Sequence, residues 1–147
     1  MKSLYRRFLD GLRVMKRGLL FLQPSTCFSK NDTRVKKIID YRIASAIESW
    51  IEEKRYLLPQ TMQQAADDMG ISRDQLSYFF HTYHSTSFLK WRKERRIAEA
   101  KALLLSQPGL SLSDLAVSVG INDRSNMRRQ FQEVTGMSPS EWVSSVR

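Results

Sequence analysis

Residues 111–142 read SLSDLAVSVGINDRSNMRRQFQEVTGMSPSEW, and the order of helix signals in this stretch decides the fold. A serine that can cap a helix begins a short apolar segment, which ends at Gly120. Met127 and Phe131 then lie four residues apart, on one side of a second helix. Glycine allows a sharp turn where φ is positive. The stretch therefore predicts two short helices joined by a tight turn, which is a helix-turn-helix unit.

The same pattern occurs about fifty residues earlier in the chain. Residues 61–91 align with residues 111–142 at an offset of 50 through the residue after the glycine and 51 beyond it, so that Gly70 meets Gly120 and Ile71 meets Ile121. The agreement in glycine, apolar type and spacing is too extensive for chance. We therefore predict two helix-turn-helix units, at about 61–83 and 111–134.

Capping signals mark helix boundaries along the rest of the main domain. Thr61 and Ser72 each have a glutamine three residues later, which is the pattern of a capping box. Ser138 precedes Pro139 at the first helical position. Strand-like alternation is absent, so we expect an all-α fold with a long linker helix at 87–106 between the two units. The other expected helices are at about 33–54, 62–69, 73–83, 112–119, 123–134 and 139–146.

The second helix of each unit should present a polar outer face. In the second copy Arg124 and Arg128 share one side, and Arg129 lies beside them. Like charges at this spacing cost a few tenths of a kcal/mol, which contact with a polyanion would offset; the alternative is that the arginines only keep the helix soluble. Arginine also bonds both acceptors of guanine. The outward residues are Arg73, Asp74, Gln75, Ser77 and Tyr78 in the first copy, and Arg124, Ser125, Arg128, Arg129 and Gln132 in the second.

The net charge of +9 favours nucleic acid or an anionic membrane surface as a partner. Residues 1–37 hold ten basic and two acidic residues, net +8, which leaves +1 for residues 38–147. Residues 4–22 carry an apolar stripe with basic residues off it, so we expect a basic amphipathic helix in this N-terminal arm. The arm is expected to pack on the domain, contact a protein partner, bind DNA phosphates or lie on a membrane.

Residues 38–147 resemble the DNA-binding domain of the AraC/XylS family of bacterial transcription regulators. The resemblance is carried by AADDMGISRDQLSYFF (65–80), FLKWRKERRIAEAKALL (88–104) and the stretch 111–142. It implies seven helices, with two helix-turn-helix subdomains joined by a rigid helix. Their two recognition helices would enter successive major grooves about 34 Å apart. The residues that the resemblance implies as base-facing are Arg73, Asp74, Gln75, Ser77, Tyr78, Arg124, Ser125, Asn126, Arg128 and Arg129.

The sequence departs from the family pattern at a few positions. Ser85 stands where the first copy usually has glycine, and Ile121 where an aromatic residue is common. Thirty-seven residues before the main domain are too few for a ligand-sensing domain, so we expect no small-molecule effector domain. The chain is then a regulator controlled by its abundance or by a partner, or a fragment of a longer protein.

Signatures of catalysis are absent: no nucleophile elbow, phosphate-binding loop or metal-ligand set occurs. We predict a protein that is not an enzyme and has no cofactor or metal. Cys27 is the single cysteine, which fits a reducing cytoplasm, where the protein would associate with the nucleoid. The expected partner is double-stranded DNA, with RNA polymerase as a further partner for an activator. Two other functions stay open: a partner- or membrane-binding adaptor, and a nucleoid-type DNA binder without sequence preference.

Two histidines and a group of basic residues lie near the start of the linker helix. His81 and His84 have no third ligand nearby in sequence, so we expect surface positions rather than a metal site. The basic residues early in the linker helix either contact phosphates or form a solvated face that pairs with Glu94 and Glu99. They are Lys90, Arg92, Lys93, Arg95 and Arg96.

Overall fold

A computed structural model describes the backbone from Lys30 to Val146 and the side chains from Asp40 to Val146. The amphipathic helix expected at 4–22 lies outside these residues. Every regular element in the described part of the chain is helical, which confirms the all-α prediction. The elements are α2 (Lys30–Glu52), the 3-10 helix η1 (Arg55–Leu57), α3 (Met62–Asp68), α4 (Arg73–His84), α5 (Phe88–Ser106), α6 (Leu112–Ser118), α7 (Arg124–Thr135) and α8 (Pro139–Val146).

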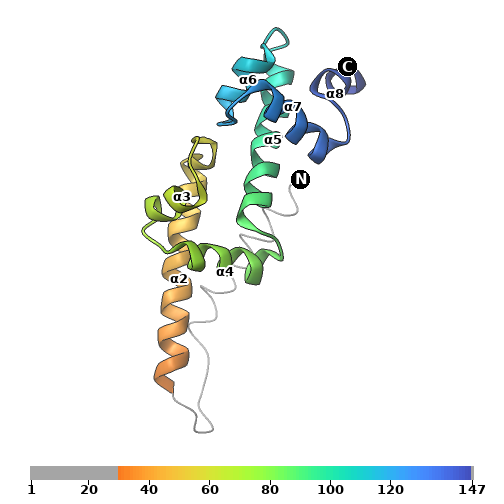
Figure 1. Cartoon of the computed structure of the whole chain (residues 1–147). Helices are drawn as coiled ribbons and strands as arrows, with labels where there is room; N and C mark the ends of the chain where they lie inside the picture. The colour runs from red at the N-terminus through yellow and green to blue at the C-terminus, as the bar shows by residue number, and fades with distance from the viewer. Residues whose placement is uncertain (1–29, 147) are drawn as a thin grey trace. The chain divides into compact units, whose positions relative to one another are not determined.

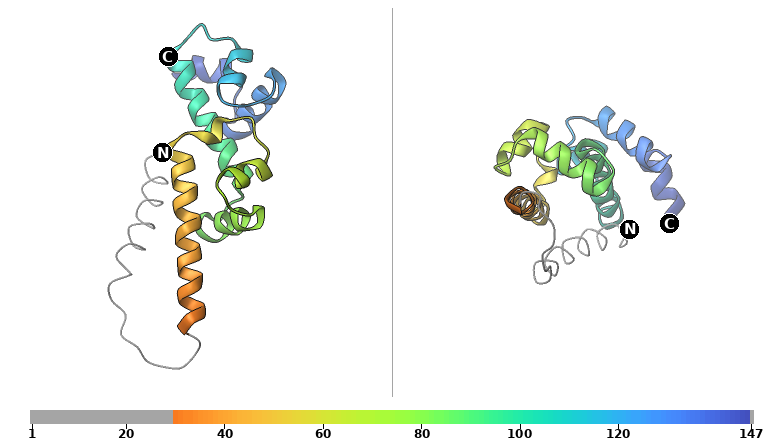
Figure 2. Two further views of the ribbon diagram at one scale, coloured as in Figure 1. Left: turned by 90° about the vertical axis from the view of Figure 1, so that its left-hand side faces the viewer. Right: turned by 90° about the horizontal axis from the view of Figure 1, so that it is seen from below.

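The chain divides within α2 into a unit that ends at Ala44 and a second unit, Ser45–Arg147. Both helix-turn-helix motifs lie in the second unit. Helix α5 runs between the pair α3–α4 and the pair α6–α7, and it contacts helices of both pairs (Figures 1 and 2). The order of elements is therefore the predicted one, with two helix-turn-helix motifs joined by a long linker helix.

Helices α3, α4 and α6 begin directly after the capping residues that the sequence indicates, Thr61, Ser72 and Ser111. Thr61 Oγ1 accepts from the Gln64 amide at 3.2 Å, and the Gln64 side chain accepts from the Thr61 amide at 2.8 Å. Ser72 forms the same reciprocal pair at the start of α4. At α6 the arrangement differs, because the Asp114 carboxylate accepts from the Ser111 hydroxyl at 2.6 Å. Aspartate is shorter than glutamine, so it binds the cap side chain.

Residues with positive φ close equivalent turns in the two motifs. Gly70 (φ 67°) and Gly120 (φ 70°) follow α3 and α6, as the repeat predicts. After α4 the left-handed residue is Ser85 (φ 52°), where Gly136 (φ 79°) follows α7. A side chain in this conformation costs about 1 kcal/mol or more, so the first motif is strained where the second is not.

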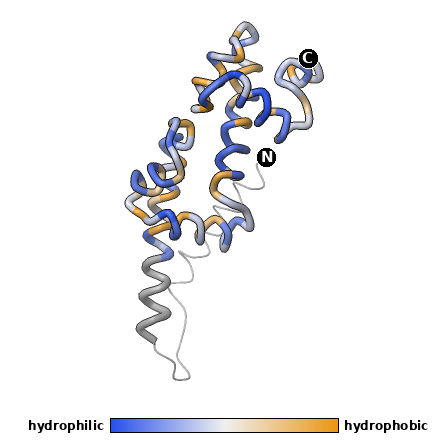
Figure 3. The backbone as a smooth tube through the Cα atoms, viewed as in Figure 1, coloured by the Kyte–Doolittle hydropathy of each residue, from blue (hydrophilic) through white to orange (hydrophobic). Residues whose placement is uncertain are grey.

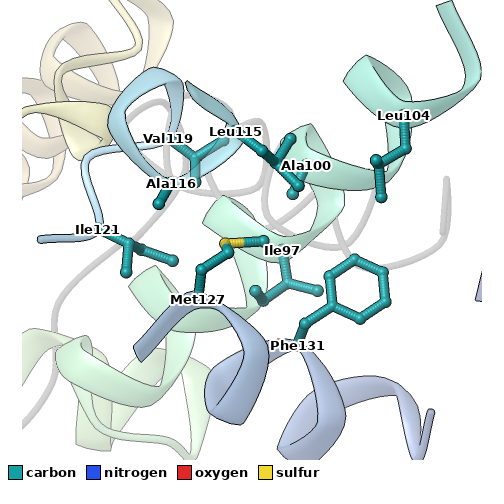
Figure 4. Close-up of a cluster of buried hydrophobic side chains, with 9 residues drawn as sticks. All are labelled: Ile97, Ala100, Leu104, Leu115, Ala116, Val119, Ile121, Met127 and Phe131. Atoms are coloured by element: carbon teal, nitrogen blue, oxygen red, sulfur yellow. The ribbon is translucent and has the colours of Figure 1, made fainter. Parts of the chain in front are cut away.

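The second motif packs on α5 through one apolar cluster. Met127 and Phe131 of α7 are both 0% exposed, and they face Ile97 of α5 (Figure 4). Leu115 and Ala116 of α6 complete the contact, and the small alanine lets the helices approach closely. This packing leaves the opposite side of α7 facing solvent.

The first motif packs on α5 through aromatic rings. The Phe80 ring centroid lies 5.3 Å from that of Phe88 and 5.1 Å from that of Trp91. Tyr83 follows Phe79 by four residues, a spacing that predicts an inward side chain. It is instead 45% exposed, with its ring 5.1 Å from that of Phe79. It lies in the last turn of α4, beyond the core, where its phenol can reach water.

Candidate nucleic-acid interface

The outer face of α7 carries the positive charge that the pattern predicts. Met127 and Phe131 anchor its other side, while Arg124, Arg128 and Arg129 are exposed. Much of α7 is hydrophilic along the chain trace (Figure 3). Three exposed guanidinium groups on one short helix can bind phosphate oxygens and guanine edges.

A row of side-chain hydrogen bonds runs along this face. Asp123 caps α7: its Oδ1 accepts from the Asn126 amide at 2.8 Å, and its Oδ2 accepts from Asn126 Nδ2 at 2.7 Å. Arg129 Nη2 donates to Asn126 Oδ1 at 2.7 Å. The hydrogen bond from the Asn126 backbone is the main cause that holds the pKa of Asp123 below its ordinary 3.8. Asn126 is half-buried, whereas neighbouring Ser125 is exposed.

The outer face of α4 has the candidate residues of the first copy, with less charge. Arg73, Asp74 and Tyr78 are exposed, while Gln75 and Ser77 are half-buried. The Gln75 side chain is engaged at the helix start, where it accepts from the Ser72 amide at 2.8 Å. Because Asp74 offsets Arg73, this face suits polar and stacking contacts more than phosphate contacts.

Arg92 of α5 is buried, which makes both sequence interpretations of it wrong. Its side chain is 4% exposed and donates to three backbone carbonyls of the loop after α2. Nε donates to Tyr56 at 3.0 Å, Nη1 to Gln60 at 2.7 Å and Nη2 to Leu58. Burial, with a smaller effect of Arg96, lowers the pKa of Arg92 to about 10. Arg92 therefore fixes a loop and is not available to a phosphate.

Arg96 binds the same loop one turn further along α5. Its Nε donates to the Tyr56 carbonyl at 2.8 Å, and its Nη2 donates to that of Leu58. Glu99, expected to pair within α5, instead accepts from the Tyr56 hydroxyl at 2.8 Å and pairs with Lys54 at 3.2 Å. Burial first, and then this hydrogen bond, raise the pKa of Tyr56. We call residues 55–60 the clamped loop.

The turn of the second motif rests on the clamped loop. A Cβ on Gly120 would lie 1.7 Å from the Leu57 carbonyl oxygen and 3.1 Å from Arg96 Nη2. At Gly70, the equivalent position in the first motif, nothing lies within 4 Å. Gly120 therefore serves both the turn and a close backbone approach. The clamped loop directly precedes α3 of the first motif and contacts Gly120 of the second, and Arg92 and Arg96 of α5 bind it. The two motifs are therefore connected through this loop.

A basic cleft of about 610 Å³ lies among the start of α3, the first half of α5 and α7. Lys90, Lys93 and Arg129 are among its lining residues. Lys93 also donates to Glu133 at 2.8 Å, which ties α5 to α7 at the edge of the cleft. An anionic segment such as a sugar–phosphate backbone suits this lining.

Other candidate chemistry finds no support in the described residues. No cluster of His, Cys, Asp and Glu there could hold a metal ion. His81 is exposed as expected, but His84 is half-buried, with its ring 5.2 Å from Phe80. Burial, and to a lesser degree Arg95, lowers the pKa of His84. None of the helices from Lys30 to Val146 has the length and hydropathy needed to cross a membrane.

Comparison with known proteins identifies relatives for much of the chain. Residues 65–145 match the family described as "Helix-turn-helix domain". Over 77 residues, 52% of this chain, the sequence is 36% identical to the arabinose operon regulatory proteins of Salmonella typhimurium and Escherichia coli. The match covers 27% and 26% of those proteins, so the chain spans about a quarter of the length of these curated relatives.

Solved structures share the fold. The C-terminal domain of AraT, a response regulator from Geobacillus stearothermophilus, superposes with a TM-score of 0.63 at 22% identity, covering 71% of this chain and 84% of that one. This similarity shows a common arrangement of helices.

Proposed function

The chain belongs to the AraC/XylS family of helix-turn-helix, DNA-binding transcription regulators, and from this premise we propose that it reads one specific double-stranded DNA site with two helices. In this proposal α4 and α7 enter successive major grooves on one face of the duplex. The observation that carries the proposal is the paired exposure of the outer faces of α4 and α7, while their inner faces are buried on α5.

The base-contacting residues are proposed from these two faces. Arg128 and Arg129 of α7 would supply guanine and phosphate contacts. On α4, Arg73 and Tyr78 would supply polar and stacking contacts, because that face has little net charge. The other proposed DNA-contacting residues are Asp74, Gln75, Ser77, Arg124, Ser125 and Asn126.

The basic cleft would hold the strand that passes between the two grooves. Lys90 is exposed at its edge and has the reach to bind a phosphate. Such contacts position the protein on the duplex without reading sequence. Lys90→Ala should therefore weaken binding to all DNA sequences by a similar factor. It should also reduce the slope of log affinity against log salt concentration by about one, the value of one phosphate contact.

Selection from a pool of random duplexes tests the proposal with the full chain. We expect a shared motif and binding at least about a thousandfold tighter to it than to unrelated DNA. Arg128→Ala and Arg129→Ala should each weaken binding to the motif by about 1–3 kcal/mol. Binding to all sequences with similar affinity would contradict the proposal and support a nucleoid-type binder.

A further inference from the structure

Asp123, Asn126 and Arg129 lie at three-residue intervals, so their side chains share one side of α7. Their hydrogen bonds form a directed row from the cap to the guanidinium: Asp123 accepts from Asn126, and Asn126 accepts from Arg129. Each of the two side-chain bonds is 2.7 Å long. The row links the residue that starts the helix to a candidate reading residue two turns away.

The chemistry of the cap determines the direction of the row. An ionised carboxylate only accepts hydrogen bonds, so Asn126 must turn its amide N–H toward Asp123. The amide oxygen of Asn126 then faces Arg129, which only donates. A cap side chain that donated instead would reverse the amide and set two donors, Asn126 Nδ2 and Arg129, against each other.

A second acidic side chain lies near Arg129. Glu133, one turn further along α7, lies close enough for Arg129 to help lower its pKa, after the larger effect of Lys93. Lys93 holds the Glu133 carboxylate at 2.8 Å. Arg129 has five N–H donors, so its hydrogen bond to Asn126 leaves others for a partner.

The first motif has no such row. Gln75 is the equivalent of Asn126, but its longer side chain reaches back to the Ser72 amide at 2.8 Å. Tyr78 stands at the position of Arg129. The row is therefore a feature of the α7 reader and not a requirement of the helix-turn-helix fold.

We propose that Asp123 and Asn126 are positioning residues that hold the Arg129 guanidinium in one orientation for base reading. This inference rests on the proposed function and deepens it, because it gives Asp123 and Asn126 a role in orienting a reading residue. A guanidinium already held in place loses less conformational entropy on binding, so it discriminates more sharply between bases.

Asp123→Asn tests the inference, because asparagine caps helices as well as aspartate does but carries a donor on its second side-chain atom. Asp123→Ser keeps a cap and removes that second atom. Asp114→Asn, which removes the same charge from α6, is the matched control. Random-duplex selection and binding to single-base-pair variants of the motif give the base preference, and thermal melts verify the fold.

We expect Arg129→Ala to abolish the preference at one base pair. Asp123→Asn and Asp123→Ser should lower the preference at that same base pair by about fivefold or more, while Asp114→Asn keeps it. In an Arg129→Ala background, Asp123→Asn should not weaken binding to the motif any further, because the row acts through Arg129.

Three outcomes separate the two proposals. A parent protein without any base preference overturns the proposed function. A parent preference that Arg129→Ala removes but both folded Asp123 variants keep overturns the positioning role alone. An equal loss of affinity for the motif from Asp123→Asn with and without Arg129 also overturns it, since a purely structural role would act in both backgrounds.

Discussion

Gly120 lies directly against the backbone of Leu57, so that an added Cβ would approach the carbonyl oxygen to 1.7 Å. Gly70 has a similar φ and open space around it. Gly70→Ala should therefore cost only the conformational strain of about 1–2 kcal/mol. Gly120→Ala should cost more than about 3 kcal/mol, because a backbone segment must also move. Urea unfolding of the two variants measures the difference, and equal losses would contradict the close approach.

Ser85 and Gly136 close the equivalent turns after α4 and α7 with φ values of 52° and 79°. Ser85→Gly should stabilise the protein by about 0.5–1 kcal/mol, because glycine adopts this conformation without strain. Gly136→Ser should destabilise it by a similar amount, since nothing lies within 4 Å of the new Cβ. Thermal melts give both values. Two changes of the same sign would show that factors other than φ dominate.

Removing the Arg92 guanidinium should lower the free energy of unfolding, because this group binds the clamped loop. Arg92→Met keeps the aliphatic stem but removes three hydrogen bonds to the clamped loop. The Gln60 carbonyl then loses its arginine donor, while Arg96 still binds the Tyr56 and Leu58 carbonyls. We expect a loss of about 3 kcal/mol or more. Lys90→Met, on the exposed side of α5, should change stability by less than about 0.5 kcal/mol. Denaturant unfolding tests this pair, and a loss at Arg92 as small as that at Lys90 would contradict the clamp.

Three exposed carboxylates predict an acid-sensitive stability. Asp123, Glu133 and Glu141 have pKa values below their ordinary 3.8, 4.5 and 4.5, mainly through bonds from Asn126, Lys93 and Ser138. A lowered folded-state pKa stabilises the fold above the ordinary value, and this contribution is lost as pH falls through the lowered one. Unfolding free energy measured from neutral to acidic pH should fall below pH 4.5. Asp123→Asn should reduce that fall; an unchanged pH dependence would contradict the assignment.

The caps of α3, α4 and α6 and the buried side of α7 could be predicted because each depends on residues within a few positions of one another. The repeat could be predicted because glycine and apolar residues recur at a nearly constant offset. The hydrogen bonds of Arg92 could not be predicted, since their acceptors are backbone carbonyls 32 to 36 residues away. Every residue has a backbone carbonyl, so the sequence does not indicate which ones accept. The close approach of Gly120 to the Leu57 carbonyl could not be predicted either. A tight turn is already a sufficient reason for glycine at that position. The hydrogen bonds of Asn126 to Asp123 and Arg129 could not be predicted either, because they depend on side-chain geometry.

Selection from random duplexes with one variant in each reading helix tests the central claim most directly. We predict a motif with two blocks about 10 base pairs apart. Arg73→Ala should alter the preference in one block only, and Arg128→Ala in the other block only. Changes confined to the same block for both variants, or a motif with a single block, would contradict the account of two helices reading successive grooves.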